Sequence, residues 1–266
     1  NADKPLFYLA PVIFFVSALT SLSVFPFFKG FVIADINIGL LFLLAMSSLG
    51  AYGIVLSGWA SNSKYAFLGG LRSASQVISY EIAMGLSLVG VMMMSGSLNL
   101  SEIVKAQHEY PTGIFAIPQA LGFFVFIVAA FAETNRLPFD LPEAESELVA
   151  GYFTEYSGFR FAMFFLGEYT GMLIMSSIAA LCFLGGWTLP KFIMDSLPFL
   201  YKLPQVIWVF VFLIKVYAFL FFYYWVRATL PRYRYDQLMT IGWKILIPLA
   251  LLNIIITATL RMTGWI

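Results

Sequence analysis

The side chains of this sequence that are best placed to do chemistry are acids in apolar surroundings. Glu81 lies in S-Y-E-I-A-M-G and Glu168 in F-L-G-E-Y, each about two turns into a long apolar segment. A charge at bilayer depth costs at least about 2.5–3.5 kcal/mol, so acids that occur there are candidates for proton or ion pathways. A structural polar contact or a nearby arginine explains one such acid equally well. Two acids at the same depth favour a proton relay.

An acid-rich segment, residues 132–158, lies between two of the apolar segments. Pro142 is typical of the first turn of a helix, and acids just after it suit the positive end of the helix dipole. On such a helix Glu143 and Glu147 share one face, and Glu145 points elsewhere. Carboxyl groups this close favour uptake of a proton by one of them. The segment holds six acids and one base, Arg136. The acids are Glu133, Asp140, Glu143, Glu145, Glu147 and Glu155.

Apolar and aromatic residues alternate with these acids, among them Phe139 and Phe153. A freely solvated loop has little use for such residues, so we expect the acid-rich segment to fold back against the membrane helices. The segments 58–75 and 227–244 interleave bases with aromatic residues in the same manner. We expect them to form loops that line a polar cavity or dock a soluble partner. Their bases are Lys64, Arg72, Arg227, Arg232, Arg234 and Lys244.

The elements that must position these residues are transmembrane helices. The sequence is 61% hydrophobic and 11% charged, with a mean hydropathy of +0.88, whereas soluble domains carry about 25% charged residues. A membrane-spanning helix needs about 20 mostly apolar residues. Seven segments qualify, which predicts an all-α, polytopic membrane protein with one domain over residues 1–266. The predicted spans are residues 6–28, 36–59, 74–94, 114–132, 161–187, 206–226 and 245–264.

The distribution of bases predicts the orientation of this protein. Seven spans place the two ends on opposite sides, with nine Lys and Arg on the N-terminal side and five on the other. The N-terminal side is therefore expected to face the cytoplasm or the mitochondrial matrix. The segment 97–112 on the other side is predicted to hold a short amphipathic helix.

Composition also excludes several functions. The net charge of +1 gives no electrostatic reason for a nucleic-acid partner. Cys182 is the single cysteine, and the single histidine, His108, lies in a polar run. A metal site built from these residues and a histidine-based catalytic triad are therefore not expected.

The segments that face the predicted inner side resemble one known family. It is the membrane subunit of proton-pumping NADH:quinone oxidoreductase, respiratory complex I, which is called H in bacteria and subunit 1 in mitochondria. Each matching stretch is short, but the set runs in the family's order and covers nearly the whole sequence. The stretches are Gly58–Leu68, Leu71–Glu81, Glu133–Gly151, Thr154–Gly158, Gly167–Tyr169 and Leu230–Met239.

The resemblance implies an eight-span helical protein, whose first span and following loop would precede this sequence. It implies that the chain holds no redox centre, catalytic residue or metal, and that quinone is the substrate at a site shared with partners. NADH, FMN and iron–sulfur clusters would belong to partner subunits. The implied partners are soluble quinone-site subunits, small membrane subunits, antiporter-like subunits and lipid, in the bacterial plasma membrane or the mitochondrial inner membrane.

The resemblance also implies roles for single residues. The proton relay would consist of Glu81, Glu133, Asp140, Glu143, Glu145, Glu147 and Glu168. Arg136 and Arg72 would be the counter-charges. The quinone cavity or the docking surface would include Lys64, Tyr156, Phe161, Arg227, Arg232 and Arg234.

Three other functions fit parts of the sequence. The membrane anchor of a related proton-pumping hydrogenase would share the acid-rich segment. A stand-alone cation or proton transporter would usually show an internal repeat with broken helices, and no repeat is evident. A purely structural anchor leaves Glu81 and Glu168 without a reason to be buried.

Overall fold

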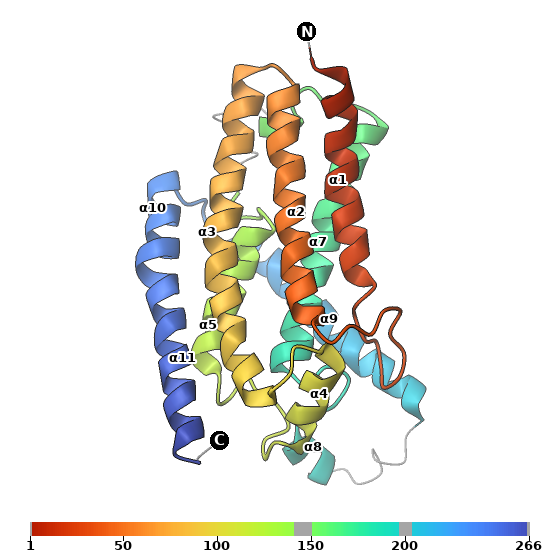
Figure 1. The fold of residues 1–266 in the computed structure, drawn as a ribbon, viewed down its shortest axis with the longest axis vertical. Helices are drawn as coiled ribbons and strands as arrows, with labels where there is room; N and C mark the ends of the chain where they lie inside the picture. The colour runs from red at the N-terminus through yellow and green to blue at the C-terminus, as the bar shows by residue number, and fades with distance from the viewer. Residues whose placement is uncertain (1, 141–150, 197–203, 265–266) are drawn as a thin grey trace.

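The computed structural model describes residues 2–140, 151–196 and 204–264, and their regular structure is helical (Figure 1). The predicted all-α, polytopic class is confirmed. Six of the described helices are long and apolar enough to cross a membrane. They are α1 (Lys4–Leu22), α2 (Gly39–Ala60), α3 (Lys64–Ser95), α7 (Phe159–Phe183), α9 (Gln205–Thr229) and the continuous run from α10 to α11 (Tyr235–Met262).

Helix α3 is longer than expected because residues 58–75 form almost no loop. α2 ends at Ala60 and α3 begins at Lys64, so Lys64 and Arg72 lie on a helix. The glycines of this segment serve close packing between α2 and α3. A Cβ added at Gly58 would lie 2.7 Å from the carbonyl oxygen of Ala66, closer than a side chain tolerates. The predicted loop was therefore wrong, and its aromatic residues Trp59, Tyr65 and Phe67 lie on α2 and α3 with exposed side chains.

The fourth predicted span is shorter than expected. Helix α5 covers only Ala120–Glu133, which is 14 residues or about 21 Å, against about 30 Å of bilayer hydrocarbon. Pro118 explains the late start, because the residue before a proline avoids helical geometry. Among the described helices, six rather than seven are therefore long enough to cross alone. The two ends of the chain nevertheless lie at opposite ends of the bundle (Figure 1).

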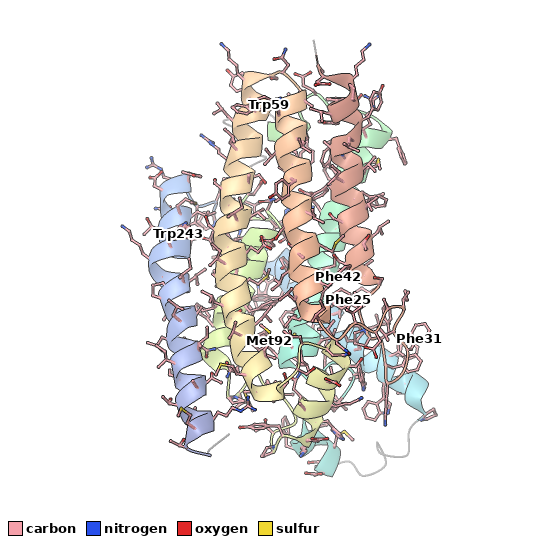
Figure 2. The ribbon with its side chains drawn as sticks, in the orientation of Figure 1. Phe25, Phe31, Phe42, Trp59, Met92 and Trp243 are labelled. Carbon is pink, nitrogen blue, oxygen red and sulfur yellow. The ribbon has the colours of Figure 1, made fainter. Side chains whose placement is uncertain are left out.

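The last membrane helix starts earlier than residue 245, where it was expected. It runs through α10 (Tyr235–Thr240), a π-helical turn η3 (Ile241–Leu246) and α11 (Ile247–Met262). The π-turn precedes Pro248, whose nitrogen cannot donate a helical hydrogen bond. Trp243 lies within the turn (Figure 2), and its indole nitrogen donates to Ser79 Oγ of α3 at 3.1 Å. Arg234 caps α10, and much of segment 227–244 is helical.

The helices form a bundle around α3. α1, α2 and α7 stand beside one another, and α10–α11 runs along another side of α3 (Figure 1). α9 leans away from the bundle and packs against α7. The short amphipathic helix predicted in residues 97–112 is confirmed as α4 (Leu100–Glu109). Its Asn99 cap accepts a hydrogen bond from the Ser101 nitrogen at 2.8 Å. Phe25, Phe31 and Phe42 mark the same end of the bundle (Figure 2).

Lys215 explains how α9, which contacts the bundle little, is attached to α7. Its side chain is partly buried, and Nζ donates to the carbonyl oxygens of Leu184 at 2.6 Å, Gly186 at 2.9 Å and Thr188. The last carbonyls of a helix have no partner within the helix. Lys215, a lysine inside a predicted span, therefore donates hydrogen bonds to carbonyl oxygens of the loop that follows α7.

We expect Lys215→Met to lower the stability of the protein by about 2 kcal/mol, because buried carbonyls lose a charged donor. The melting temperature of the purified protein measures this loss. Lys29→Met, which changes an exposed lysine near the same end of the bundle, is the control and is expected to leave the melting temperature unchanged. An unchanged melting temperature in the Lys215 variant would show that the three hydrogen bonds contribute nothing net.

Candidate functional site

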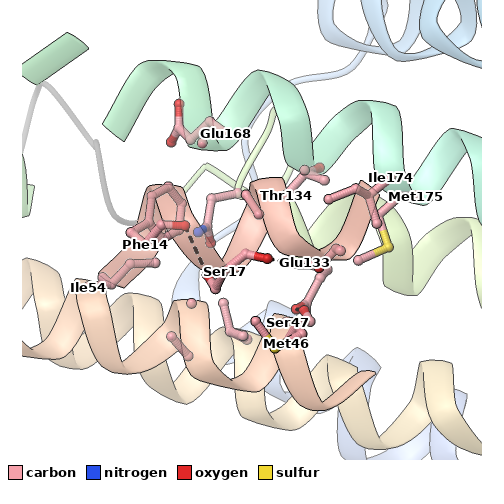
Figure 3. A pocket seen from close by; sticks show the side chains of 18 of the residues that line it. Phe14, Ser17, Met46, Ser47, Ile54, Glu133, Thr134, Glu168, Ile174 and Met175 are labelled. Atoms are coloured by element: carbon pink, nitrogen blue, oxygen red, sulfur yellow. Dashed lines mark hydrogen bonds between the residues drawn. The ribbon is translucent and has the colours of Figure 1, made fainter. Parts of the chain in front are cut away.

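A pocket lies between α1, α2, α3, α7 and the end of α5. Two of the predicted relay acids line it: Glu133 from the last turn of α5 and Glu168 from α7. Figure 3 shows Ser47 beside Glu133, and Glu168 on a separate helix. The sequence places these two acids 35 positions apart, so the fold brings them to one cavity. The remaining polar residues of the lining are Ser17, Ser21, Ser47, Thr134 and Asn135.

Glu168 is neutralised by an arginine. Its Oε2 lies 3.1 Å from Arg136 Nη2, and the exposed fractions of the two side chains are 4% and 10%. The Arg136 guanidinium also lies 5.0 Å from the centroid of the Tyr169 ring. In an ion pair buried this deeply, the Coulomb attraction offsets the free energy of desolvation only when the two groups are close and well aligned. Glu168 therefore carries a charge whose partner is fixed in place.

The turn that carries Arg136 is held by polar side chains of α3. Gln76 is fully buried, and its Nε2 donates to the carbonyl oxygens of Ala132 at 2.8 Å and Phe139 at 2.7 Å. Asn135, whose backbone is left-handed at φ 50°, donates from Nδ2 to Ser73 Oγ at 3.2 Å. One glutamine thus joins both ends of the turn. The prediction that the acid-rich segment folds back against the helices is confirmed in its described residues.

Glu133 and Glu81 are held by hydroxyl groups. Ser47 Oγ donates to Glu133 Oε1 at 2.5 Å, and Ser48 Oγ donates to Glu81 Oε1. Within the described part of the chain, neither carboxyl has a lysine or arginine within ion-pair distance. Because α3 begins at Lys64, Glu81 lies near the middle of that helix instead of two turns from its start. Among the described residues, neither acid has a counter-charge like the one that Arg136 gives Glu168.

Asp140 lies apart from the pocket in the same turn. Its Oδ2 lies 3.1 Å from Arg232 Nη2, a base of the connection between α9 and α10. The nitrogen of Tyr233 also donates to the carbonyl oxygen of Pro138 at 3.0 Å. Two segments that are far apart in sequence therefore meet at Asp140 and Arg232. Glu143, Glu145 and Glu147 lie outside the described residues.

The residues expected at a quinone cavity or docking surface do not gather at one place. Tyr156 is buried and stacks on Phe7 with 4.0 Å between ring centroids, and burial raises the pKa of its hydroxyl above the usual range. Phe161 packs against Phe153 at 5.7 Å. The bases are more exposed: Lys64 begins α3, Arg72 follows on it, and Arg227 and Arg234 flank the connection to α10. Within the described residues, no group of three or more His, Cys, Asp and Glu could hold a metal.

Several polar residues of the site were not anticipated. Ser47 and Ser48 hold two acids, and Gln76 and Asn135 fix the turn of Arg136. A signal was present, because A-M-S-S-L places two neighbouring hydroxyls inside an apolar segment. A glutamine within a helix that crosses a membrane is a signal of the same kind.

The fold and the pocket define a multi-pass, α-helical membrane protein with carboxyl groups buried among its helices. Comparison with known sequences specifies the class further. The chain belongs to the NADH dehydrogenase family, whose sequence model matches residues 1–258.

Curated relatives extend over nearly the whole chain. The H subunit of NADH-quinone oxidoreductase from Rhodospirillum rubrum is 53% identical over 264 residues, which are 99% of this chain and 75% of that protein. The corresponding protein of Rickettsia typhi is 54% identical over 97% of this chain and 74% of its own length. That of Magnetococcus marinus is 52% identical over 94% and 70%. The expected family is confirmed, and the chain is a multi-pass subunit of the bacterial or mitochondrial inner membrane.

Proposed function

We propose that this chain works within NADH:quinone oxidoreductase as the membrane subunit that couples quinone reduction to proton translocation. The observation that carries the proposal is the pocket lined by Glu133 and Glu168. Ser47 of α2 donates to Glu133, and the next residue of α2, Ser48, donates to Glu81 of α3. One of these acids is paired with an arginine, and two are held by hydroxyls. A carboxylate stabilised by a hydroxyl is easier to protonate than one beside an arginine. Glu133 and Glu81 are therefore the members proposed to change protonation.

The other parts of the proposal follow from membership of the family. Quinone would be bound at a site shared with soluble subunits at the N-terminal end of the bundle, which would face the cytoplasm or matrix. NADH, FMN and iron–sulfur clusters would be bound by partner subunits, and antiporter-like subunits would receive the coupling signal. Arg136 and Arg72 would act as counter-charges, and residues 1–266 would fold as one domain.

The relay would begin where the acid-rich segment meets the bundle. Asp140 and Glu168, each beside an arginine, supply fixed negative charge near the turn. When the charge on a nearby quinone changes, its electrostatic interaction with the acids shifts their protonation. Glu133 and Glu81, which interact electrostatically, then pass the change toward the centre of α3. In this proposal Glu143, Glu145 and Glu147 belong to the part of the relay nearest to the quinone.

We expect Glu133→Gln to lower NADH-driven proton pumping by at least about tenfold, because glutamine keeps the size of the side chain and cannot exchange a proton. The assembled complex in sealed membrane vesicles is the system to use. Proton uptake and quinone-dependent NADH oxidation are measured on the same vesicles. Glu81→Gln is expected to behave in the same manner.

Glu102→Gln is the matched control. Glu102 also accepts a hydrogen bond from a serine hydroxyl, that of Ser97. Unlike Glu133, it is exposed, and it lies on α4 at the far end of the bundle. Its replacement is expected to leave pumping at the wild-type level. Wild-type pumping in the Glu133 variant would remove Glu133 from the relay.

A further inference from the structure

Two neighbouring serines of α2 contact acids on two different helices. Ser47 Oγ donates to Glu133 at the end of α5, and Ser48 Oγ donates to Glu81 in the middle of α3. Successive residues of a helix point about 100° apart, so one turn of α2 serves both acids. The carboxyls of Glu81 and Glu133 also interact electrostatically. α2 therefore supplies a hydroxyl to each of the two acids proposed to change protonation.

Ser48 differs from Ser47 in having a second acceptor within reach. Its Oγ lies 3.1 Å from the carbonyl oxygen of Leu44, one helical turn earlier on α2. A serine hydroxyl carries one proton and two lone pairs, so it donates to one group at a time. Glu81 and Leu44 therefore compete for the same proton.

This competition gives Ser48 two satisfied states. When Glu81 is a carboxylate, the Ser48 hydroxyl donates to it. When Glu81 is protonated, the carboxylic acid donates to Ser48 Oγ, and the hydroxyl turns to donate to the Leu44 carbonyl. Only the hydroxyl proton rotates between these states, and no bond to hydrogen breaks in Ser48. Both states avoid the cost of an unsatisfied buried polar group.

We propose that Ser48 is a positioning residue that holds Glu81 in both of its protonation states and so lowers the barrier between them. The proposal rests on the function proposed above, in which Glu81 takes up and releases a proton. For Ser47 the structure gives one acceptor, Glu133, so Ser47 holds its acid as a donor only. Ser48 is for this reason the residue to test.

The test compares Ser48→Ala, Ser48→Thr and Glu81→Gln in the assembled complex in sealed vesicles. Ser48→Ala is expected to lower NADH-driven proton pumping by about threefold to tenfold, the range for one hydrogen bond. Ser48→Thr keeps a hydroxyl that can donate to Leu44 or Glu81 and is expected to retain at least half of the pumping. Ser57→Ala is the control, since Ser57 is a buried serine of α2 that donates only within its helix, to Ile54 at 2.7 Å.

An infrared measurement separates positioning from general stability. The carbonyl stretch of protonated Glu81 is assigned in the redox difference spectrum by its loss in Glu81→Gln. We expect this band to shift in Ser48→Ala and to stay in place in Ser57→Ala and Ser48→Thr. Native electrophoresis checks that each variant assembles, and Ser48→Ala adds no atoms that could clash.

Two outcomes would overturn the proposal in different ways. If Ser48→Ala pumps as the wild type does with an unshifted band, while Glu81→Gln is impaired, Ser48 has no positioning role and the proposed function stands. If Glu81→Gln itself pumps normally, Glu81 leaves the relay and the role of Ser48 is lost with it. A band shift with reduced pumping, rescued by threonine, supports the proposal.

Discussion

Arg136→Met is expected to prevent stable assembly, with a loss of about 3–5 kcal/mol, because it leaves a buried carboxylate without its cation. The Glu168 side chain is 4% exposed, and its Oε2 lies 3.1 Å from Arg136 Nη2. Methionine removes the charge and keeps an unbranched chain of similar length. The amount of complex on a native gel and its melting temperature measure the loss.

The double variant Arg136→Met with Glu168→Gln distinguishes an unpaired charge from a lost contact. Replacing both members of a buried ion pair by neutral groups is often close to neutral for stability. We therefore expect the double variant to assemble better than Arg136→Met alone. An equally poor yield of both variants would assign the defect to the packing of Arg136, whose guanidinium lies against Tyr169.

Arg232→Met is the matched control for the same chemistry at a more exposed place. Arg232 and Asp140 also lie 3.1 Å apart, but their side chains are 32% and 11% exposed, against 10% and 4% for Arg136 and Glu168. The Arg232 side chain is the more exposed of the two arginines, so its removal is expected to cost less than that of Arg136, in the direction of a surface pair. A loss in Arg232→Met as large as that in Arg136→Met would contradict the dependence on burial.

Gly69→Val is expected to destabilise the protein by about 3 kcal/mol, at the upper end of the range for overpacking. A Cβ at Gly69 of α3 would lie 2.8 Å from Gly151 Cα and 2.9 Å from the Tyr152 nitrogen. These are backbone atoms of the short 3-10 turn η1 (Gly151–Phe153). Backbone atoms cannot rotate away as the end of a side chain can. The turn that closes the acid-rich segment must therefore move, and fully buried Tyr152 with it.

Gly85→Ala on the same helix is the control for Gly69→Val. The nearest atom to a Cβ at Gly85 is Leu44 Cδ1 at 3.9 Å, an ordinary contact distance. Alanine is favoured over glycine inside a helix by about 0.8–1.0 kcal/mol, so this variant is expected to be as stable as the wild type or more stable. A melting temperature for Gly69→Val that matches that of Gly85→Ala would show that η1 yields without cost.

The sequence alone determined that this is a membrane protein and which family it belongs to, and it drew attention to Glu133 and Glu168, which the fold brings to one pocket. Burial of 61% hydrophobic residues needs a bilayer, and a charge inside an apolar segment stands out because it is expensive there. Hydrophobic runs also located the six described helices that are long and apolar enough to cross a membrane, and the pattern of residues 97–112 located the amphipathic helix α4. These conclusions depend on composition and on neighbours along the chain, which a sequence states directly.

Tertiary structure alone decided which groups meet. Apolar runs set where a helix can cross a bilayer and say little about its ends outside, so α3 and the last helix began earlier than expected. Arg136 could have faced any acid of its segment, and the fold pairs it with Glu168 on α7. In the sequence, Ser47 and Ser48 are only two polar residues in an apolar run, and the packing of the helices places them against Glu133 and Glu81. A hydrogen bond forms only when donor and acceptor lie about 3 Å apart, within a few tenths of an ångström, and helix packing sets that distance between different helices.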